Sequence, residues 1–155
     1  MTQEELIAKY KQTFIHYAHS WWRHNLYEFC WSESCQKCVE ATSEQIENLE
    51  HLCRDILEPI ESHFGVVTIT QGIRDLEVYN KLAELHEKHP DIYSLPSRTS
   101  HHFTGNAVDF KHSEMPKIFE WCVQQGLPTR ELRLYRYHIH AASFPVEMKK
   151  IKDCR

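Results

Sequence analysis

The residues best suited to chemistry lie in one short segment, where a histidine and an aspartate flank a tight turn. The segment reads Ser100-His101-His102-Phe103-Thr104-Gly105-Asn106-Ala107-Val108-Asp109. Gly105 lets the backbone fold back, and Ala107 shares a strand face with Asp109, which leaves room beside the carboxylate. Imidazole and carboxylate groups both bind zinc. We therefore expect His102 and Asp109 to meet at one metal ion, although a surface ion pair would show the same spacing.

A third ligand must come from another part of the chain. A catalytic zinc site typically uses three protein ligands and keeps a fourth position open for water. The segment His138-Ile139-His140 offers two imidazoles on one face of a predicted strand. From the residues alone, either histidine could be the ligand.

The cysteines suggest a second site. The chain has 6 cysteines and 12 histidines in 155 residues. The spacing of Cys30, Cys35 and Cys38 is compatible with a structural metal. The fourth ligand would then be His24, His51 or Cys53. A buried cluster of free thiols is an equally weighted alternative. In a reducing cytosol, we expect no obligatory disulfide.

Hydrophobic periodicity predicts the elements that must position these side chains. The predicted elements are helices over 4–22, 42–64, 75–89 and 116–125, strands over 66–70, 107–110 and 131–143, and an exposed loop over 94–104. Thr42 and Gln45 have the spacing of a capping box, and Asp75 is a predicted N-cap. Pro59 should bend or loosen the second helix, and Gly65 should end it.

The order of elements predicts the fold class. Helices come first, and strands and helices then mix without a regular βαβ repeat. This order favours an α+β fold with a small, mainly antiparallel sheet packed with helices. We expect residues 1–155 to form a single domain, with a helical and cysteine-bearing extension over about 1–43.

Composition argues against several classes of function. The formal net charge of -4 argues against a nucleic-acid binder, which would concentrate basic residues on one face. The apolar runs are too short to cross a membrane. The first nine residues lack the basic leader of a secretory signal, so we expect cytoplasmic synthesis.

The histidine and aspartate motif resembles that of the zinc D-alanyl-D-alanine carboxypeptidases and related peptidoglycan peptidases, including phage endolysins. Their fold is shared with the hedgehog signalling domain. The family pattern Ser-x-His-x-x-Gly-x-Ala-x-Asp is intact at Ser100, His102, Gly105, Ala107 and Asp109. The segment Tyr137-His138-Ile139-His140 is similar to the closing aromatic and His-x-His of the family. The resemblance implies that His102, Asp109 and His140 bind zinc.

The resemblance extends upstream and covers residues from about 26 to about 144. The segment Ile69-Thr70-Gln71-Gly72-Ile73-Arg74 is similar to the strand and turn whose arginine faces the substrate in this family. A planar guanidinium can hold a peptide carboxylate through two hydrogen bonds. The resemblance therefore implies that Arg74, together with Ser100, contacts the substrate.

One feature of the family is missing. Many active members carry a glutamate shortly before the final histidine, where it acts as a general base. Two tyrosines and an arginine occupy residues 135–137 instead. Glu131 has the opposite strand parity to His138 and His140, so it could serve only if a bulge intervened. We expect His138 to transfer the proton, because a neutral imidazole can do so near neutral pH.

The predicted function is a zinc-dependent peptidase that acts on peptidoglycan stem peptides at bonds adjoining D-amino acids. A phage enzyme of this kind would have to be released from the cytoplasm to reach the cell wall. One alternative is a binding module that keeps the metal and has lost turnover. Another is a zinc hydrolase that acts on a cytosolic substrate.

Overall fold

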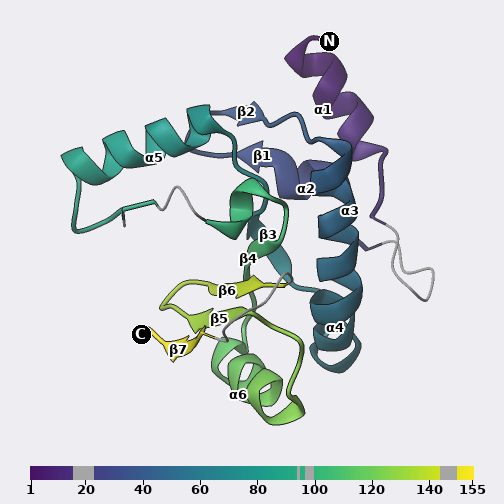
Figure 1. The fold of residues 1–155 in the computed structure, drawn as a ribbon, viewed down its shortest axis with the longest axis vertical. Coiled ribbons are helices and arrows are strands. Elements are labelled where there is room, and N and C mark those ends of the chain that lie inside the picture. The colour runs from purple at the N-terminus through teal and green to yellow at the C-terminus, as the bar shows by residue number, and fades with distance from the viewer. Residues whose placement is uncertain (16–22, 94, 97–99, 144–149) are drawn as a thin grey trace.

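The computed structural model describes residues 1–15, 23–93, 95–96, 100–143 and 150–155 (Figure 1). Its helices are α1 (Gln3–Lys11), α2 (Leu26–Cys30), α3 (Ser43–Leu52), α4 (Glu58–Phe64), α5 (Leu76–Lys88) and α6 (Met115–Gln125), together with a π-helical turn, Cys53–Leu57, and a 3-10 helix, His101–Phe103. Its strands are β1 (Trp31–Ser32), β2 (Lys37–Cys38), β3 (Thr68–Gln71), β4 (Ala107–Lys111), β5 (Glu131–Leu134), β6 (Ile139–Ala142) and β7 (Lys150–Asp153).

The described strands form one larger sheet and one small hairpin. The larger sheet has the order β3-β4-β6-β5-β7, and β1 pairs with β2. All these pairs are antiparallel except β5 with β7, which is parallel. In Figure 1, α3 and α4 run along one side of the sheet, α6 lies at its lower end, and α5 projects from the body. The predicted α+β class with a mainly antiparallel sheet is confirmed.

The N-terminal helix and the cysteine-bearing segment share one hydrophobic core with the sheet. Leu6 and Tyr10 of α1 belong to the same buried cluster as Cys30, Cys38 and Phe110. Burial of these apolar groups contributes about 25 cal/mol for each Å² removed from water. The first helices therefore help to stabilise the sheet that carries the candidate site. None of the described helices is both long and apolar enough to span a bilayer.

The predicted helix boundaries are confirmed where side-chain caps define them. Thr42 accepts a hydrogen bond from the backbone N–H of Gln45, and the Gln45 side chain accepts one from the Thr42 N–H. Asp75 Oδ1 accepts from the Val78 N–H at 2.9 Å and caps α5. These caps satisfy backbone donors that a helix cannot satisfy internally.

Pro59 loosens its helix as predicted. It lacks an N–H, and its ring crowds the carbonyl four residues earlier in a regular α-helix. The chain widens just before it into the π-helical turn, where the Glu58 N–H donates to the Cys53 carbonyl five residues back. Gly65 follows α4 with a positive φ of 91° and ends the helix.

The predicted first helix over 4–22 is wrong over residues 12–15. Helix α1 ends at Lys11, and the Thr13 hydroxyl donates to the Lys9 carbonyl at 2.7 Å. The chain then turns so that the Ile15 N–H donates to the His24 carbonyl at 2.9 Å, which buries the Ile15 side chain. Tertiary pairing thus overrides the helical periodicity at this point. Residues 16–22 lie outside the described residues.

The predicted single strand over 131–143 is also wrong, because the chain reverses within it. The Tyr135 N–H donates to the His138 carbonyl at 2.9 Å, between the antiparallel strands β5 and β6. Odd-numbered residues of β5 stand opposite even-numbered residues of β6, so Arg133 pairs with His140. Two short strands can satisfy each other's backbone groups, whereas one long strand would need other partners.

The predicted exposed loop over 94–104 is corrected at its C-terminal end. His101–Phe103 forms the 3-10 helix, and the His102 side chain is only 2% exposed. Residues 94 and 97–99 lie outside the described part of the chain. This helix brings a polar segment into the interior beside β4.

A buried histidine connects α2 to α4 by two ion pairs. His24 Nδ1 lies 2.9 Å from Glu28 Oε1, and His24 Nε2 lies 2.7 Å from Glu61 Oε2. Glu61 Oε2 also accepts from the Val67 N–H at 3.1 Å. Burial opposes protonation of His24, but the two carboxylates outweigh it and raise its pKa to about 9. His24 is therefore a cation at neutral pH.

We predict a loss of stability at alkaline pH that depends on His24. Its folded-state pKa is raised, so its contribution is complete below pH 6.5 and is lost as pH rises through about 9. The loss should be on the order of 3 kcal/mol, because one pKa unit corresponds to about 1.4 kcal/mol. Chemical denaturation of the wild type and of His24→Gln between pH 6 and pH 10 measures it. An identical pH dependence in the two proteins would contradict the prediction.

Candidate metal site

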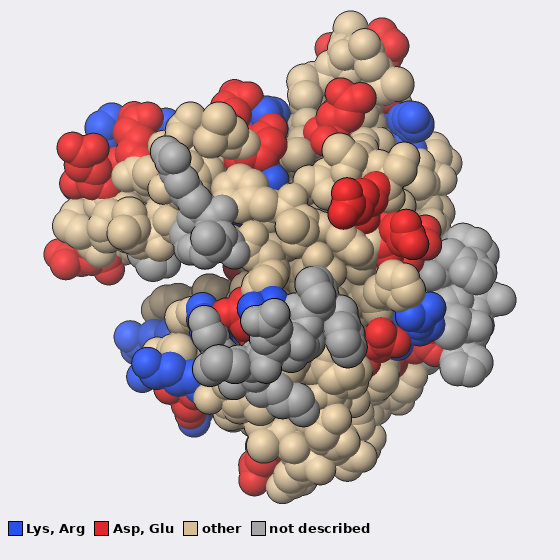
Figure 2. All heavy atoms as spheres, in the orientation of Figure 1, with Lys and Arg blue, Asp and Glu red and all other residues tan. Residues whose placement is uncertain are grey.

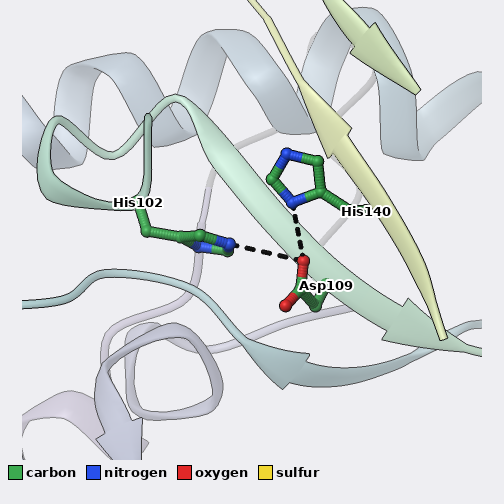
Figure 3. Close-up of side chains that lie close together, drawn as sticks. All are labelled: His102, Asp109 and His140. Atoms are coloured by element: carbon green, nitrogen blue, oxygen red, sulfur yellow. Dashed lines mark hydrogen bonds and ion pairs between the residues drawn. The ribbon is translucent and has the colours of Figure 1, made fainter. Parts of the chain in front are cut away.

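Three side chains from separate segments converge in the interior. His102 comes from the 3-10 helix, Asp109 from β4 and His140 from β6, and Figure 3 shows their side chains pointing toward one another. His102 Nε2 lies 3.3 Å from Asp109 Oδ1, and His140 Nδ1 lies 2.8 Å from the same oxygen. Their ligand atoms all lie within 4.8 Å of one another. This buried group could hold a metal ion.

Hydrogen bonds to the turn after β3 orient His102. Its Nδ1 donates to the Gly72 carbonyl at 2.6 Å, while its own carbonyl accepts from the Arg74 N–H at 3.1 Å. Because a carbonyl can only accept, the proton of the neutral imidazole sits on Nδ1. Burial lowers the pKa of His102 and so favours this neutral form, although Asp109 opposes the shift. The Nε2 lone pair therefore faces Asp109.

Close backbone approaches hold the two turns that carry these residues. A Cβ added at Gly72 would lie 2.4 Å from the Phe29 carbonyl oxygen in α2. A Cβ at Gly105, whose φ is +80°, would lie 2.4 Å from the Gln45 carbonyl oxygen in α3. The Gln45 side chain donates to the Phe103 carbonyl at 2.9 Å. Helices α2 and α3 thus pack directly against the turns at Gly72 and Gly105. Only glycine leaves room for this close backbone contact.

Asp109 and His140 stand opposite each other on paired strands. The register places them in one cross-strand pair, and both are buried. Burial alone would raise the pKa of Asp109, but His102 and His140 outweigh it and hold that pKa well below its usual range. Burial likewise opposes protonation of His140, and the carboxylates of Asp109 and Glu131 raise its pKa to about 9. A metal ion would replace the proton between His140 and Asp109.

The candidate ligands open into a cavity of about 300 Å³. Figure 2 shows the surface hollowed between the projecting α5 and the region below it. The structure brings every histidine, aspartate, arginine and serine predicted for the active site to this cavity, which is lined by Arg74, Ser100, His102, Asp109, His138 and His140. The fold thus brings residues that are far apart in the sequence to one cavity.

Arg74 borders the cavity with spare hydrogen-bonding capacity. Its Nη2 donates to Gln71 Oε1, and its buried Nε has no hydrogen-bond partner among the described residues. Burial lowers the pKa of Arg74, and Asp109 partly offsets that shift. Arginine remains charged across the ordinary pH range. Arg74 therefore offers a cation with an unused donor to an anionic ligand.

His138 lies at the edge of the candidate ligands and is partly exposed. Its Nε2 is 3.8 Å from Asp109 Oδ2, farther than the corresponding nitrogens of His102 and His140 lie from Asp109. Its ring stacks on Tyr135 with centroids 4.7 Å apart. Burial lowers the pKa of His138, against the opposing effect of Asp109. His138 is therefore neutral at pH 7 and able to accept a proton.

Glu131 is a site residue that the sequence analysis misplaced. Its Oε1 lies 3.6 Å from the Nε2 of His140 and 3.6 Å from the Nε2 of His101, and Oε2 accepts from Arg133 at 2.6 Å. His140 beside it lowers the pKa of Glu131 to about 2. A carboxylate at this nitrogen orients a ligating imidazole and raises its basicity. Glu131 thus contacts a candidate ligand and does not line the cavity.

The length of the predicted strand over 131–143 could have revealed the position of Glu131. A single strand over 131–143 would be much longer than the usual ~5–6 residues. Recognising the hairpin would have placed Glu131 and Arg133 on the face of His140. No comparable feature of the sequence indicates the apolar wall of the cavity, which comes from α5 and the following loop. This wall is lined by Leu82, Ile92, Tyr93, Leu95 and Pro96.

The cysteines do not form a second group of this kind in the described part of the chain. Among those residues, one set of three histidine, cysteine or acidic ligand atoms lies close together, and it contains no cysteine. Cys30, Cys35 and Cys38 are free thiols, and Cys53 is buried. Burial raises the pKa of the Cys30 thiol, and raises that of Cys38 to about 11. This environment suits protonated core thiols.

Comparisons with known proteins leave the family open. No protein-family model matches the chain, and no curated protein matches it. The functional argument therefore rests on the residues and their geometry.

We predict that one divalent ion binds per chain through the three converging side chains. Each of His102→Ala, Asp109→Ala and His140→Ala should reduce the bound zinc to below about a tenth of an ion, because two ligands hold zinc weakly. His138→Ala and Cys35→Ser should keep the ion. Elemental analysis after dialysis measures the content, and circular dichroism checks the fold. Metal lost in His138→Ala and kept in His140→Ala would reassign the third ligand. Two ions in the wild type, with one kept in His102→Ala, would support a separate cysteine site.

We also predict that Glu131 strengthens metal binding without touching the ion. Glu131→Gln should weaken zinc affinity by about ten- to a hundredfold, since the amide cannot supply the charge that polarises His140. Glu120→Gln, an exposed change on α6, is the matched control and should leave the affinity unchanged. Competition with a chromogenic chelator measures both. Equal affinities in the two variants would show that Glu131 has no part in the site.

Proposed function

We propose that this chain is a zinc-dependent peptidase that hydrolyses bonds adjoining D-amino acids in peptidoglycan stem peptides. The observation that carries the proposal is the convergence of His102, Asp109 and His140 on a cavity that Arg74 and His138 also line. These are the positions that match the family motif. The small, mainly antiparallel sheet supports a hedgehog-type fold as part of the same proposal.

The donor set supports zinc as the metal. Two imidazole nitrogens and one carboxylate oxygen form a typical catalytic zinc set with one position left for water or substrate. When bound, zinc lowers the pKa of a water molecule and polarises the carbonyl group of a substrate. The hydrogen bond from His102 to the Gly72 carbonyl and the carboxylate of Glu131 beside His140 keep both imidazoles in place.

His138 is the proposed proton carrier. Its imidazole is neutral because burial lowers its pKa, and it lies beside the candidate ligands at the cavity. It can accept a proton from the attacking water and then donate it to the leaving amine, so that water adds across the peptide bond. Stacking on Tyr135 limits the rotation of the ring and holds its nitrogen toward the cavity.

Arg74 is the proposed anchor for a substrate carboxylate. Its buried Nε makes no hydrogen bond among the residues described, and its charge faces the cavity. A carboxylate that accepts from this guanidinium would be held in a fixed orientation relative to the ligands. This function fits a peptide with a free carboxyl group near the bond that is cleaved.

A binding module without turnover is the second candidate. Asp109 is the one carboxylate among the described residues that line the cavity, and it belongs to the candidate ligands. No acidic side chain is therefore left there to act as the general base of the active family members. This arrangement favours a protein that binds peptide and metal, unless His138 supplies the proton transfer.

We predict that zinc-loaded protein cleaves purified stem peptides. Chromatography with mass spectrometry should detect new fragments, and their formation should stop on chelation. His138→Gln should lower kcat by about 10²- to 10⁴-fold with its zinc content unchanged, because only proton transfer is removed. Arg136→Gln changes an exposed arginine in the neighbouring turn and should keep full activity. Peptide binding by zinc-loaded protein without any fragment would support the binding module instead.

A further inference from the structure

Four polar side chains stand in register across the sheet at the cavity. Gln71 pairs with Asp109, Asp109 with His140, and His140 with Arg133, on the adjacent strands β3, β4, β6 and β5. All four line the cavity. Because paired residues on adjacent strands share a face, two of the three candidate ligands, Asp109 and His140, occupy the middle of a row about 14 Å long.

A cation stands at each end of this row. At the β3 end, Arg74 donates to Gln71. At the β5 end, Arg133 belongs to the row itself. Both guanidinium groups reach the same cavity, on opposite sides of the candidate ligands.

Arg133 is held in place and keeps donors for a ligand. One of its nitrogens donates to Glu131 Oε2 at 2.6 Å, and it also contacts the Tyr135 side chain. A guanidinium has five N–H donors, so one strong ion pair fixes its position without using all of them. Its side chain is 31% exposed, which leaves it open to the cavity.

The charge of Arg133 is not cancelled by Glu131. The Glu131 carboxylate lies 3.6 Å from both His101 and His140, so its charge is shared among three neighbours. With a divalent cation bound, the two arginines and the ion outweigh the carboxylates of Asp109 and Glu131. The cavity is therefore electropositive at both ends and attracts anionic groups.

The facing wall of the cavity is apolar and strengthens these charges. Leu82 of α5 and Ile92, Leu95 and Pro96 of the following loop line it. Figure 2 shows the hollow beneath α5 into which a ligand would enter. Apolar side chains on that wall lower the local dielectric and increase the strength of an ion pair on the floor.

We propose that the cavity binds a peptide with two acidic groups, one held by Arg74 and the other by Arg133, on either side of the metal ligands. Arg133 is then a specificity-determining residue. The proposal takes only one element from the proposed peptidase function, namely that the ligand is a peptide. An extended chain spans the row in about four residues. The substrate class is an acidic stem peptide, in preference to one whose side carboxylate is amidated.

The test uses four matched peptides and measures binding apart from turnover. The parent is N-acetyl-L-Ala-γ-D-Glu-L-Lys-D-Ala, and the others carry an amide at the D-Glu α-carboxyl, at the C-terminus, or at both. Isothermal titration calorimetry gives Kd for the zinc-loaded wild type, Arg74→Gln and Arg133→Gln. Arg136→Gln is the matched control, because this exposed arginine does not line the cavity. Zinc content and circular dichroism confirm that each variant keeps its site.

Each amidation should raise the Kd of the wild type tenfold or more. In Arg133→Gln the effect of one amidation should disappear, and in Arg74→Gln the effect of the other. Amidation effects in Arg133→Gln equal to those in the wild type would overturn the proposal, as would the absence of binding by all four peptides. Binding with the expected pattern and no cleavage would keep the two anchors and contradict the peptidase. Cleavage with Kd values that do not change on amidation would support the peptidase and contradict the two anchors.

Discussion

The buried carboxylate of Asp109 is the group on which the candidate site depends. A carboxylate withdrawn from water is costly by several kcal/mol unless opposite charge and hydrogen bonds compensate for it. His140, on the neighbouring strand, supplies that compensation at one oxygen atom, and the neutral His102 of the 3-10 helix faces the same oxygen. The three side chains thus form a tertiary contact as well as a candidate ligand set. A divalent ion would add positive charge beside the buried carboxylate of Asp109, where the fold already places charged side chains.

The helices before the sheet act on the site through the backbone. Helix α2 touches the turn at Gly72, and α3 touches the turn at Gly105, both so closely that a side chain there would collide with a carbonyl oxygen. The Gly72 carbonyl in turn accepts a hydrogen bond from His102 Nδ1. The N-terminal part of the chain therefore helps to determine which nitrogen of His102 faces the cavity. The geometry of the site is a property of the whole core.

The β5–β6 hairpin gives the site two further charges with different tasks. Glu131 lies behind His140, with its Oε1 3.6 Å from the Nε2 of that imidazole, and Arg133 lies beside His140 at the cavity. Their mutual ion pair holds both in place. The hairpin thus supports a candidate ligand and gives the cavity a cationic edge. A hydrolase and a binding module would both use these features, and proton transfer by His138 would separate the two proposed functions.

Local sequence determined the features that depend on nearest neighbours along the chain. The caps at Thr42 and Asp75, the loosening before Pro59 and the ligand motif ending at Asp109 were all readable, because backbone hydrogen bonding and steric limits act within a few residues. Tertiary structure alone decided where α1 ends, where residues 131–143 reverse, and that Glu131 and Arg133 reach His140. Those outcomes depend on strand pairing between distant segments, whose register sets the face on which each side chain lies.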